Sequence, residues 1–148
     1  MRILMVCLGN ICRSPLAEGI LASKVGDDVF VDSAGTSDWH VGKAPDPRSI
    51  EVAAQHNLDI SHLRGRQFTV EDFDNFDLIY VMDASNYQNV VRLARTQEDE
   101  DKVIMILNEV NQGRNEQVPD PYYGGDDGFE KVYQMLDEAT DRILMKIS

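Results

Sequence analysis

Apolar residues along this 148-residue chain form short continuous runs, separated by segments in which they recur every three or four positions. Four runs, at residues 3–6, 29–31, 78–81 and 103–106, contain mostly aliphatic side chains with no alternating polar positions. Runs of this kind are typical of strands covered on both faces. We therefore predict four buried strands.

The segments between these runs contain signals for helices. Pro15 opens a first helix, and the Asp-Pro pair at residues 46–47 provides the cap and first position of a second, which ends near Asn57. Asp83 or Ser85 caps a third helix. Asp83 and the nearby Asn86 are interpreted as capping residues without a chemical role.

The carboxyl-terminal segment gives the clearest helical pattern. Its apolar residues recur at three and four positions with charges between them, namely Phe129, Val132, Tyr133, Leu136, Ala139 and Ile143. The acidic run at residues 98–101 is predicted to be a solvated loop.

Strands that alternate with helices predict an α/β fold. We expect a single domain over residues 1–148, with a four-stranded, mostly parallel sheet, right-handed connections and helices on both faces. A ligand crevice should then lie at the carboxyl ends of the strands.

The net charge of the chain limits the classes of partner that we expect it to bind. A formal net charge of −12 argues against nucleic acid or an anionic membrane, because both are bound through basic surfaces. The apolar run at the amino terminus is too short to span a bilayer, so we expect no leader or membrane anchor. The only two cysteines, Cys7 and Cys12, fit a reducing cytoplasm better than a disulfide-rich fold.

The candidate chemistry lies between the first strand and the first helix. Residues 7–14, here called the phosphate-binding loop, read Cys-Leu-Gly-Asn-Ile-Cys-Arg-Ser and are followed by the helix-opening Pro15. Such a loop directs backbone N–H groups at an anion, and the helix dipole adds partial positive charge. Gly9 and Asn10 tolerate a positive φ, so the loop can curl around a phosphate. The predicted phosphate-binding residues are Leu8, Gly9, Asn10, Ile11, Cys12, Arg13 and Ser14.

Three side chains of this loop have separate expected roles. Cys7 is expected to be a thiolate at neutral pH, because electropositive surroundings favour the ionised form. Arg13 offers a planar fork of donors that matches two phosphate oxygens. The Ser14 hydroxyl can donate to the thiolate and improve it as a leaving group.

The loop resembles that of the low-molecular-weight protein tyrosine phosphatases, C-x-G-N-x-C-R-S-P, and matches every position of it. The resemblance continues over almost the whole chain, at residues 32–36, 37–39, 45–48, 82–83 and 120–124. It implies hydrolysis of phosphotyrosine through a cysteinyl phosphate, with Cys7 as nucleophile, Arg13 as phosphate clamp and Asp120 as general acid and base. It also implies that no metal or cofactor takes part.

The resemblance further implies a substrate pocket and its partners. Trp39, Tyr122 and Tyr123 would line a slot for the ring of a phosphotyrosine-containing protein or peptide, and phosphate-like oxyanions would inhibit. Leu8 and Ile11 offer apolar edges to the same ring. In the related protein-arginine phosphatases a threonine stands in place of Ile11, so isoleucine favours phosphotyrosine over phosphoarginine.

Two residues outside the loop would support it. By the same resemblance, Ser33 and His62 hold Asn10 in its unusual backbone geometry. The role of Cys12 stays open between a small buried residue and a redox partner for Cys7, with which it could form a disulfide.

Other functions are weighed against the hydrolase. An arsenate reductase of the same fold uses further cysteines later in the chain, but none follows Cys12. A phosphate-binding module or a phosphocysteine carrier would need Cys7 and the loop but not Asp120. A zinc site would need four ligands, which two cysteines in one tight loop and three scattered histidines do not supply.

Overall fold

The four apolar runs form one parallel sheet in the computed structural model, which describes residues 1–123 and 126–148 without the side chains of residues 123 and 126. The strands are β1 (Arg2–Cys7), β2 (Phe30–Gly35), β3 (Leu78–Val81) and β4 (Val103–Met105). Their order across the sheet is β2-β1-β3-β4, and every neighbouring pair is parallel. The predicted four-stranded sheet is confirmed.

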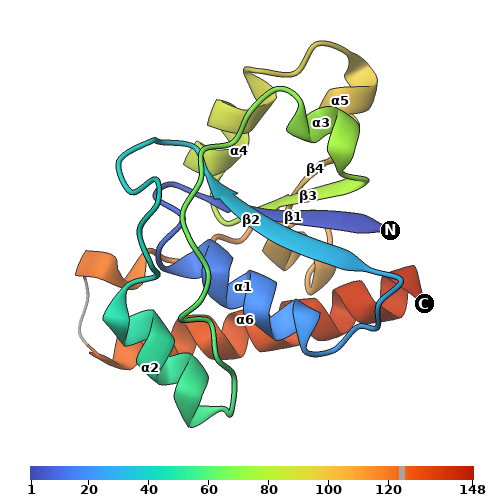
Figure 1. Ribbon diagram of the computed structural model, residues 1–148. Helices are drawn as coiled ribbons and strands as arrows, with labels where there is room; N and C mark the ends of the chain where they lie inside the picture. The colour runs from blue at the N-terminus through green and yellow to red at the C-terminus, as the bar shows by residue number, and fades with distance from the viewer. Residues whose placement is uncertain (124–125) are drawn as a thin grey trace.

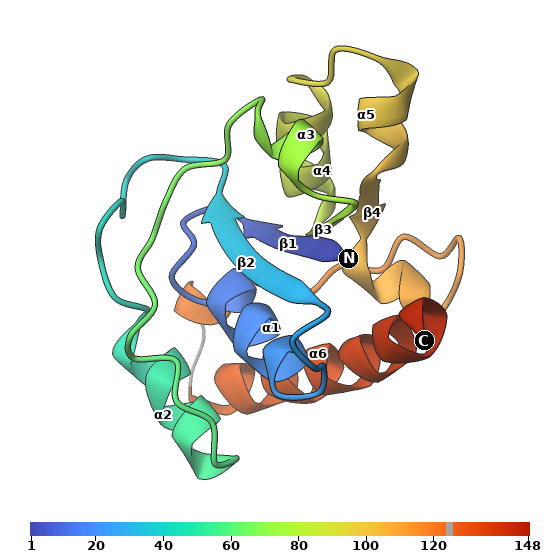
Figure 2. The same ribbon diagram turned by 45° about the vertical axis from the view of Figure 1, so that its right-hand side comes forward.

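Helices cover both faces of this sheet, as predicted (Figures 1 and 2). One face carries α1 (Arg13–Ala22), α2 (Pro47–Gln55) and α6 (Asp126–Ile147), and the other carries α3 (Asp72–Asn75), α4 (Ala84–Val91) and α5 (Gln97–Asp101). Two short 3₁₀ helices, η1 (Ile106–Glu109) and η2 (Pro121–Tyr123), lie in the connections. The buried apolar residues accordingly form two clusters, one on each side of the sheet.

Local capping explains where these helices begin. Helix α1 starts at Arg13, two residues before Pro15, so the proline lies in the first turn, where its missing N–H breaks no intrahelical bond. Asp46 accepts the N–H of Arg48 at 2.9 Å and caps α2. The third helix is capped by Asp83 rather than Ser85.

The loop predicted for the acidic run at residues 98–101 is wrong, because this segment forms α5. The Thr96 hydroxyl accepts the N–H of Asp99 at 3.1 Å and caps the helix. Asp99 itself is buried and accepts hydrogen bonds from the backbone and the guanidinium of Arg95. Carboxylates in the first turn of a helix are favoured by its dipole, so this run stabilises a short helix.

The strand order determines where a ligand can bind. From β1 the chain continues to β2 on one side and later to β3 on the other, so the order switches between β1 and β3. Crevices in open parallel sheets lie at the carboxyl ends of the strands at such a point. Cys7 ends β1 and Asp83 follows β3 by two residues. No helix among the described residues has the length and apolar composition needed to cross a membrane.

Candidate active site

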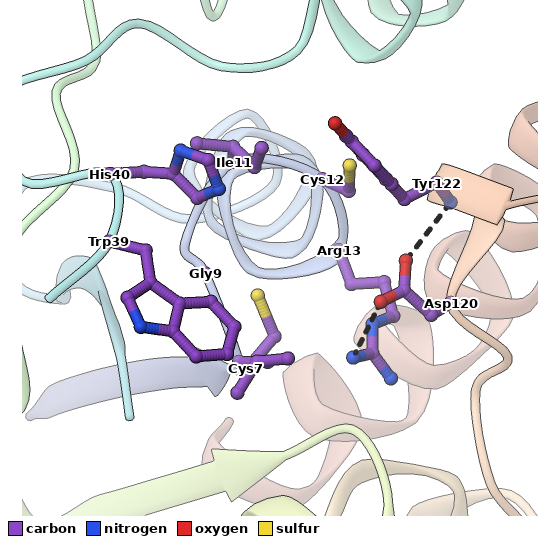
Figure 3. Close-up of a pocket in the computed structure, with 10 residues that line it drawn as sticks. Cys7, Gly9, Ile11, Cys12, Arg13, Trp39, His40, Asp120 and Tyr122 are labelled. Atoms are coloured by element: carbon purple, nitrogen blue, oxygen red, sulfur yellow. Dashed lines mark hydrogen bonds and ion pairs between the residues drawn. The ribbon is translucent and has the colours of Figure 1, made fainter. Parts of the chain in front are cut away.

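A cavity of about 140 Å³ opens at the carboxyl end of β1 (Figure 3). Its lining brings together ten residues, namely Cys7, Leu8, Gly9, Ile11, Cys12, Arg13, Trp39, His40, Asp120 and Tyr122. Sequence reasoning had grouped all of them except His40. An apolar cavity of about 150 Å³ accommodates a benzene ring. The enclosed space therefore suits one aromatic ring above the phosphate-binding loop.

The side chain of Asn10 organises the loop beneath this cavity. Its carbonyl oxygen Oδ1 accepts the backbone N–H of Arg66 at 3.1 Å, which fixes the orientation of the amide because a backbone N–H only donates. Its Nδ2 then donates to Ser14 Oγ at 2.8 Å and to Ser33 Oγ at 3.0 Å. The one hydrogen of the Ser14 hydroxyl is left for Cys7 Sγ, 3.0 Å away. Ser14 is therefore placed to donate its hydrogen to the sulfur.

The backbone of the loop contains one left-handed residue. Asn10 has a φ of 57°, whereas Gly9 does not have the positive φ that was also considered for it. Gly9 is needed instead for close packing, since a Cβ there would lie 2.9 Å from the His40 ring. A Cβ on Gly35 would lie 2.8 Å from the carbonyl oxygen of Leu8. The glycine on β2 thus lets this strand approach the loop, and the glycine in the loop lets His40 approach it.

The guanidinium of Arg13 is almost fully buried, with 3% of the side chain exposed. Its Nη1 donates to Asp83 Oδ2 at 2.7 Å and to the carbonyl oxygen of Val118 at 2.9 Å. Burial alone would lower the pKa of Arg13, but the negative charges of Cys7 and Asp83 outweigh it, so the pKa is raised. Arg13 is therefore a fixed positive charge at the base of the cavity.

Asp83 is a site residue that sequence reasoning missed. It was interpreted only as a helix cap, and one of its oxygens does accept the N–H of Asn86 at 2.8 Å. The other oxygen accepts a hydrogen bond from Arg13, so the same carboxylate orients the Arg13 guanidinium. In the sequence, Asp83 comes just after a buried strand, which is a position expected of site residues. Only the strand order shows that this strand lies beside β1.

Asp120 lies on the side of the cavity next to Arg13, on the segment that leads into η2 (Figure 3). Its Oδ1 accepts the N–H of Tyr122 at 3.0 Å, and its Oδ2 lies 3.7 Å from Arg13 Nη2 (Figure 3). The side chain is 31% exposed. A carboxyl group is thus held at the edge of the cavity, within reach of both a bound ligand and water.

Two aromatic residues form the mouth of the cavity. Trp39 and Tyr122 are 66% and 44% exposed and lie on different segments, one following β2 and the other in η2. The side chain of Tyr123, the third residue predicted for the pocket, lies outside the described residues. An exposed tryptophan and an exposed tyrosine on opposite sides of the cavity provide apolar surface that a flat ligand could cover (Figure 3).

The expected role of His62 is not supported by the structure. Its side chain is exposed, and the Asn10 carbonyl oxygen is bound instead by the Arg66 backbone. Ser33, by contrast, accepts from Asn10 as predicted. His62 lies four residues before Arg66, and the sequence does not show which of these two residues contacts Asn10.

Cys12 differs from Cys7 in its surroundings. Burial, followed by the charges of Asp46, Cys7 and Asp120, raises the pKa of the Cys12 thiol to about 12. Cys12 is therefore protonated at neutral pH. Within the described residues, no group of three or more histidine, cysteine and carboxylate side chains is arranged as a metal site.

Known proteins similar to this chain share its length and its fold. A family model described as low molecular weight phosphotyrosine protein phosphatase matches residues 2–148. A putative low molecular weight protein-tyrosine-phosphatase of Synechocystis is 42% identical to this chain, and the matched region covers 99% of this chain and 96% of the relative. The low molecular weight phosphotyrosine protein phosphatase of Schizosaccharomyces pombe is 40% identical, with 99% and 97% covered.

Solved structures give the same result. A protein tyrosine phosphatase of Entamoeba histolytica, crystallised with Hepes in the active site, superimposes with a TM-score of 0.91 at 34% identity and covers 99% of this chain and 96% of its own. A Drosophila arginine phosphatase superimposes with a TM-score of 0.92, also at 34% identity, with 100% and 98% covered.

Proposed function

We propose, since this chain belongs to the low molecular weight phosphotyrosine protein phosphatase family, that it hydrolyses phosphotyrosine in proteins or peptides through a cysteinyl phosphate on Cys7. The observation that carries this proposal is the geometry around the sulfur. Cys7 receives a hydrogen bond from Ser14, and Arg13 and Asp120 line the same cavity. The residues that we propose as nucleophile, phosphate clamp and acid therefore line one cavity.

In the first step, the Cys7 thiolate attacks phosphorus from the side opposite the tyrosine oxygen. The S–P bond forms while the P–O bond to the ring breaks, and the bonding electrons leave with the phenolic oxygen. Asp120 donates a proton to that oxygen, because a phenolate is a poor leaving group near neutral pH. The N–H groups of the phosphate-binding loop and the Arg13 guanidinium hold the remaining oxygens as charge develops on them.

In the second step, water replaces the phenol at the mouth of the cavity. Asp120, now a carboxylate, takes a proton from this water as it attacks phosphorus. The P–S bond breaks, and Cys7 leaves as a thiolate that receives the hydrogen bond from Ser14. Inorganic phosphate is released, and the enzyme returns to its starting state without a metal ion.

The competing functions lack supporting residues. No cysteine follows Cys12 to relay electrons, as an arsenate reductase would require. A phosphate carrier would have no use for Asp120, which reaches the cavity edge. The likeness to an arginine phosphatase keeps phosphoarginine as the alternative substrate, but Ile11 lines the cavity with an apolar side chain, which favours an aromatic ring.

The proposed function predicts activity that needs no added metal. The purified chain should release phosphate from phosphotyrosine peptides and aryl phosphates at the same rate with and without excess chelator, and vanadate should inhibit it, because its five-coordinate geometry resembles the transition state. The rate of phosphate release from a phosphotyrosine peptide is compared with the rate from phosphoarginine at the same concentration. A requirement for magnesium or zinc, or a preference for phosphoarginine, would contradict the proposal.

We further predict that Cys12 protects Cys7 from irreversible oxidation. Peroxide converts a thiolate that it can reach to a sulfenic acid, and both cysteines line the same open cavity (Figure 3). Oxidation removes the Cys7 charge, one of the causes that keep Cys12 protonated. The Cys12 sulfur can then lose its proton and attack the oxidised sulfur, and the hydroxyl leaves with that proton as water while the disulfide forms. Wild type treated with peroxide should lose about two mass units and recover activity with dithiothreitol.

The Cys12→Ser variant is the comparison for this prediction. It should gain oxygen atoms under the same treatment and recover poorly. Equal recovery of both proteins, with no disulfide in wild type, would assign Cys12 a packing role only.

A further inference from the structure

Behind the phosphate-binding loop, a chain of hydrogen bonds runs from Cys7 to an acid that the reaction does not use. Ser14 donates to Cys7, and Asn10 donates to both Ser14 and Ser33. The Ser33 hydroxyl then donates to Glu18 Oε1 at 2.6 Å. Glu18 lies on α1, one turn after Ser14, and it is not among the residues that line the cavity.

When Cys7 is a thiolate and Glu18 a carboxylate, the direction of every hydrogen bond in this chain is fixed. Asn10 Nδ2 can only donate, so the Ser33 oxygen accepts there and its single hydrogen must point elsewhere. The hydrogen of the Ser33 hydroxyl is donated to the Glu18 carboxylate. Without such an acceptor, Ser33 would keep its hydrogen unpaired in a mostly buried position or turn it toward the Asn10 amide, which donates too.

We infer that Glu18 is a positioning residue for the phosphate-binding loop, holding Asn10 through Ser33 so that the Ser14 hydroxyl stays directed at Cys7. The strain of the loop gives this support a purpose. Asn10 has a φ of 57°, a left-handed conformation that persists only where its surroundings impose it. Its side-chain hydrogen bonds impose it, and Glu18 is the charged end of that network.

The surroundings of Glu18 make this support sensitive to pH. Burial raises the pKa of Glu18 to about 7, the Ser33 hydrogen bond lowers it, and the charges of Asp32 and Arg66 act in opposite directions. Asp32 and Arg66 are themselves paired at 3.1 Å. Because the Ser33 hydrogen bond favours the carboxylate, ionisation of Glu18 must in turn strengthen that bond.

The test compares variants with wild type across pH. Glu18→Gln mimics the protonated acid, so its kcat/KM for p-nitrophenyl phosphate should equal that of wild type well below neutral pH. Above neutral pH it should fall roughly three- to tenfold below wild type, the difference between a charged and a neutral hydrogen bond. Shared titrations of substrate and Cys7 cancel in this ratio. A merely structural role predicts a ratio that does not change with pH.

Ser33→Ala provides a second, independent measurement, which also serves if Glu18→Gln folds poorly. The kcat/KM of Ser33→Ala should lie below that of wild type at every pH. The ratio of variant to wild type should fall further as the pH rises through the inflection expected for Glu18→Gln. In the Ser33→Ala background, Glu18→Gln should have no additional effect, since the chain is already broken. Additive losses in the double variant would overturn the inference.

Glu51→Gln is the matched control, because it makes the same substitution at an exposed glutamate of α2 that has no part in this network. Its kcat/KM should stay within about twofold of wild type across the same pH range. The inference rests on the proposed function, but the two fail differently. An inactive wild type would refute the function, whereas an active wild type with a constant Glu18→Gln ratio, or an equal response to Glu51→Gln, would refute the role of Glu18.

Discussion

Replacing Cys7 with serine should lower kcat by a factor of at least about 10⁴ while leaving oxyanion binding intact. A serine hydroxyl is not ionised near neutral pH, so the Ser14 hydrogen bond and the Arg13 charge have no anion to stabilise. The loop donors that hold phosphate are unchanged by the substitution. Binding should even tighten somewhat, because the thiolate no longer repels the phosphate dianion.

The measurements for Cys7→Ser separate chemistry from binding. Turnover of p-nitrophenyl phosphate reports the first, and calorimetric titration with a phosphotyrosine peptide reports the second. In wild type, rapid quenching during turnover should trap phosphate on the peptide that contains residues 7–14, and this label should be absent from the variant. Cys12→Ser is the natural comparison, since it changes the other sulfur of the same loop, and its cysteinyl phosphate should still form. Substantial turnover by Cys7→Ser would exclude the cysteinyl mechanism.

The same substitution yields a reagent for finding substrates. A protein that binds phosphotyrosine without hydrolysing it should retain its physiological partners from a cell extract. Phosphopeptides recovered on Cys7→Ser, and displaced by vanadate, would identify the sequence around the target tyrosine. The exposed rings of Trp39 and Tyr122 at the cavity mouth should contact the residues that flank the target tyrosine.

Continuous apolar runs and local motifs predicted the sheet and the phosphate-binding loop because both depend on neighbouring residues. The order of strand, cysteine, glycine, arginine and helix brings Cys7 and Arg13 together without any distant contact. Asp120 could be joined to them only through the family resemblance, since more than 100 residues separate it from Arg13 in the sequence. The structure places its carboxylate 3.7 Å from that guanidinium.

The residues that sequence reasoning missed act through contacts that depend on the strand order. Asp83 reaches Arg13 because β3 lies beside β1, and a helix-capping pattern looks the same wherever the strand is placed. Glu18 reaches Ser33 because β2 flanks β1 on the other side. His62 was assigned from resemblance alone, and the turn that carries it leaves it exposed. Supporting residues are therefore harder to predict than reacting ones, because they have no motif of their own.

Asp120, the proposed general acid, offers the second large effect. Asp120→Ala should lower kcat for a phosphotyrosine peptide by a factor of about 10²–10⁴ with little change in KM, because the proton is needed only as the P–O bond breaks. The carboxylate also accepts the N–H of Tyr122 at 3.0 Å, so alanine could disturb η2 as well as remove the acid. Asp120→Asn separates these effects. Its carbonyl oxygen can keep that hydrogen bond, but the amide cannot serve as the acid.

Both Asp120 variants should therefore lose similar activity toward phosphotyrosine, and the loss should depend on the leaving group. Nitrophenolate is a much weaker base than the tyrosine phenolate and leaves without help, so p-nitrophenyl phosphate should suffer a far smaller loss in the first step. A plot of log kcat/KM against the basicity of a series of phenols should be shallow for wild type and steep for both variants. If Asp120→Asn kept near wild-type activity while Asp120→Ala did not, the carboxyl group would be an anchor for η2 and the proton would have to come from elsewhere. Equal losses across the whole series of phenols would likewise remove Asp120 from the acid role, because only a group that protonates the leaving oxygen makes the rate insensitive to its basicity.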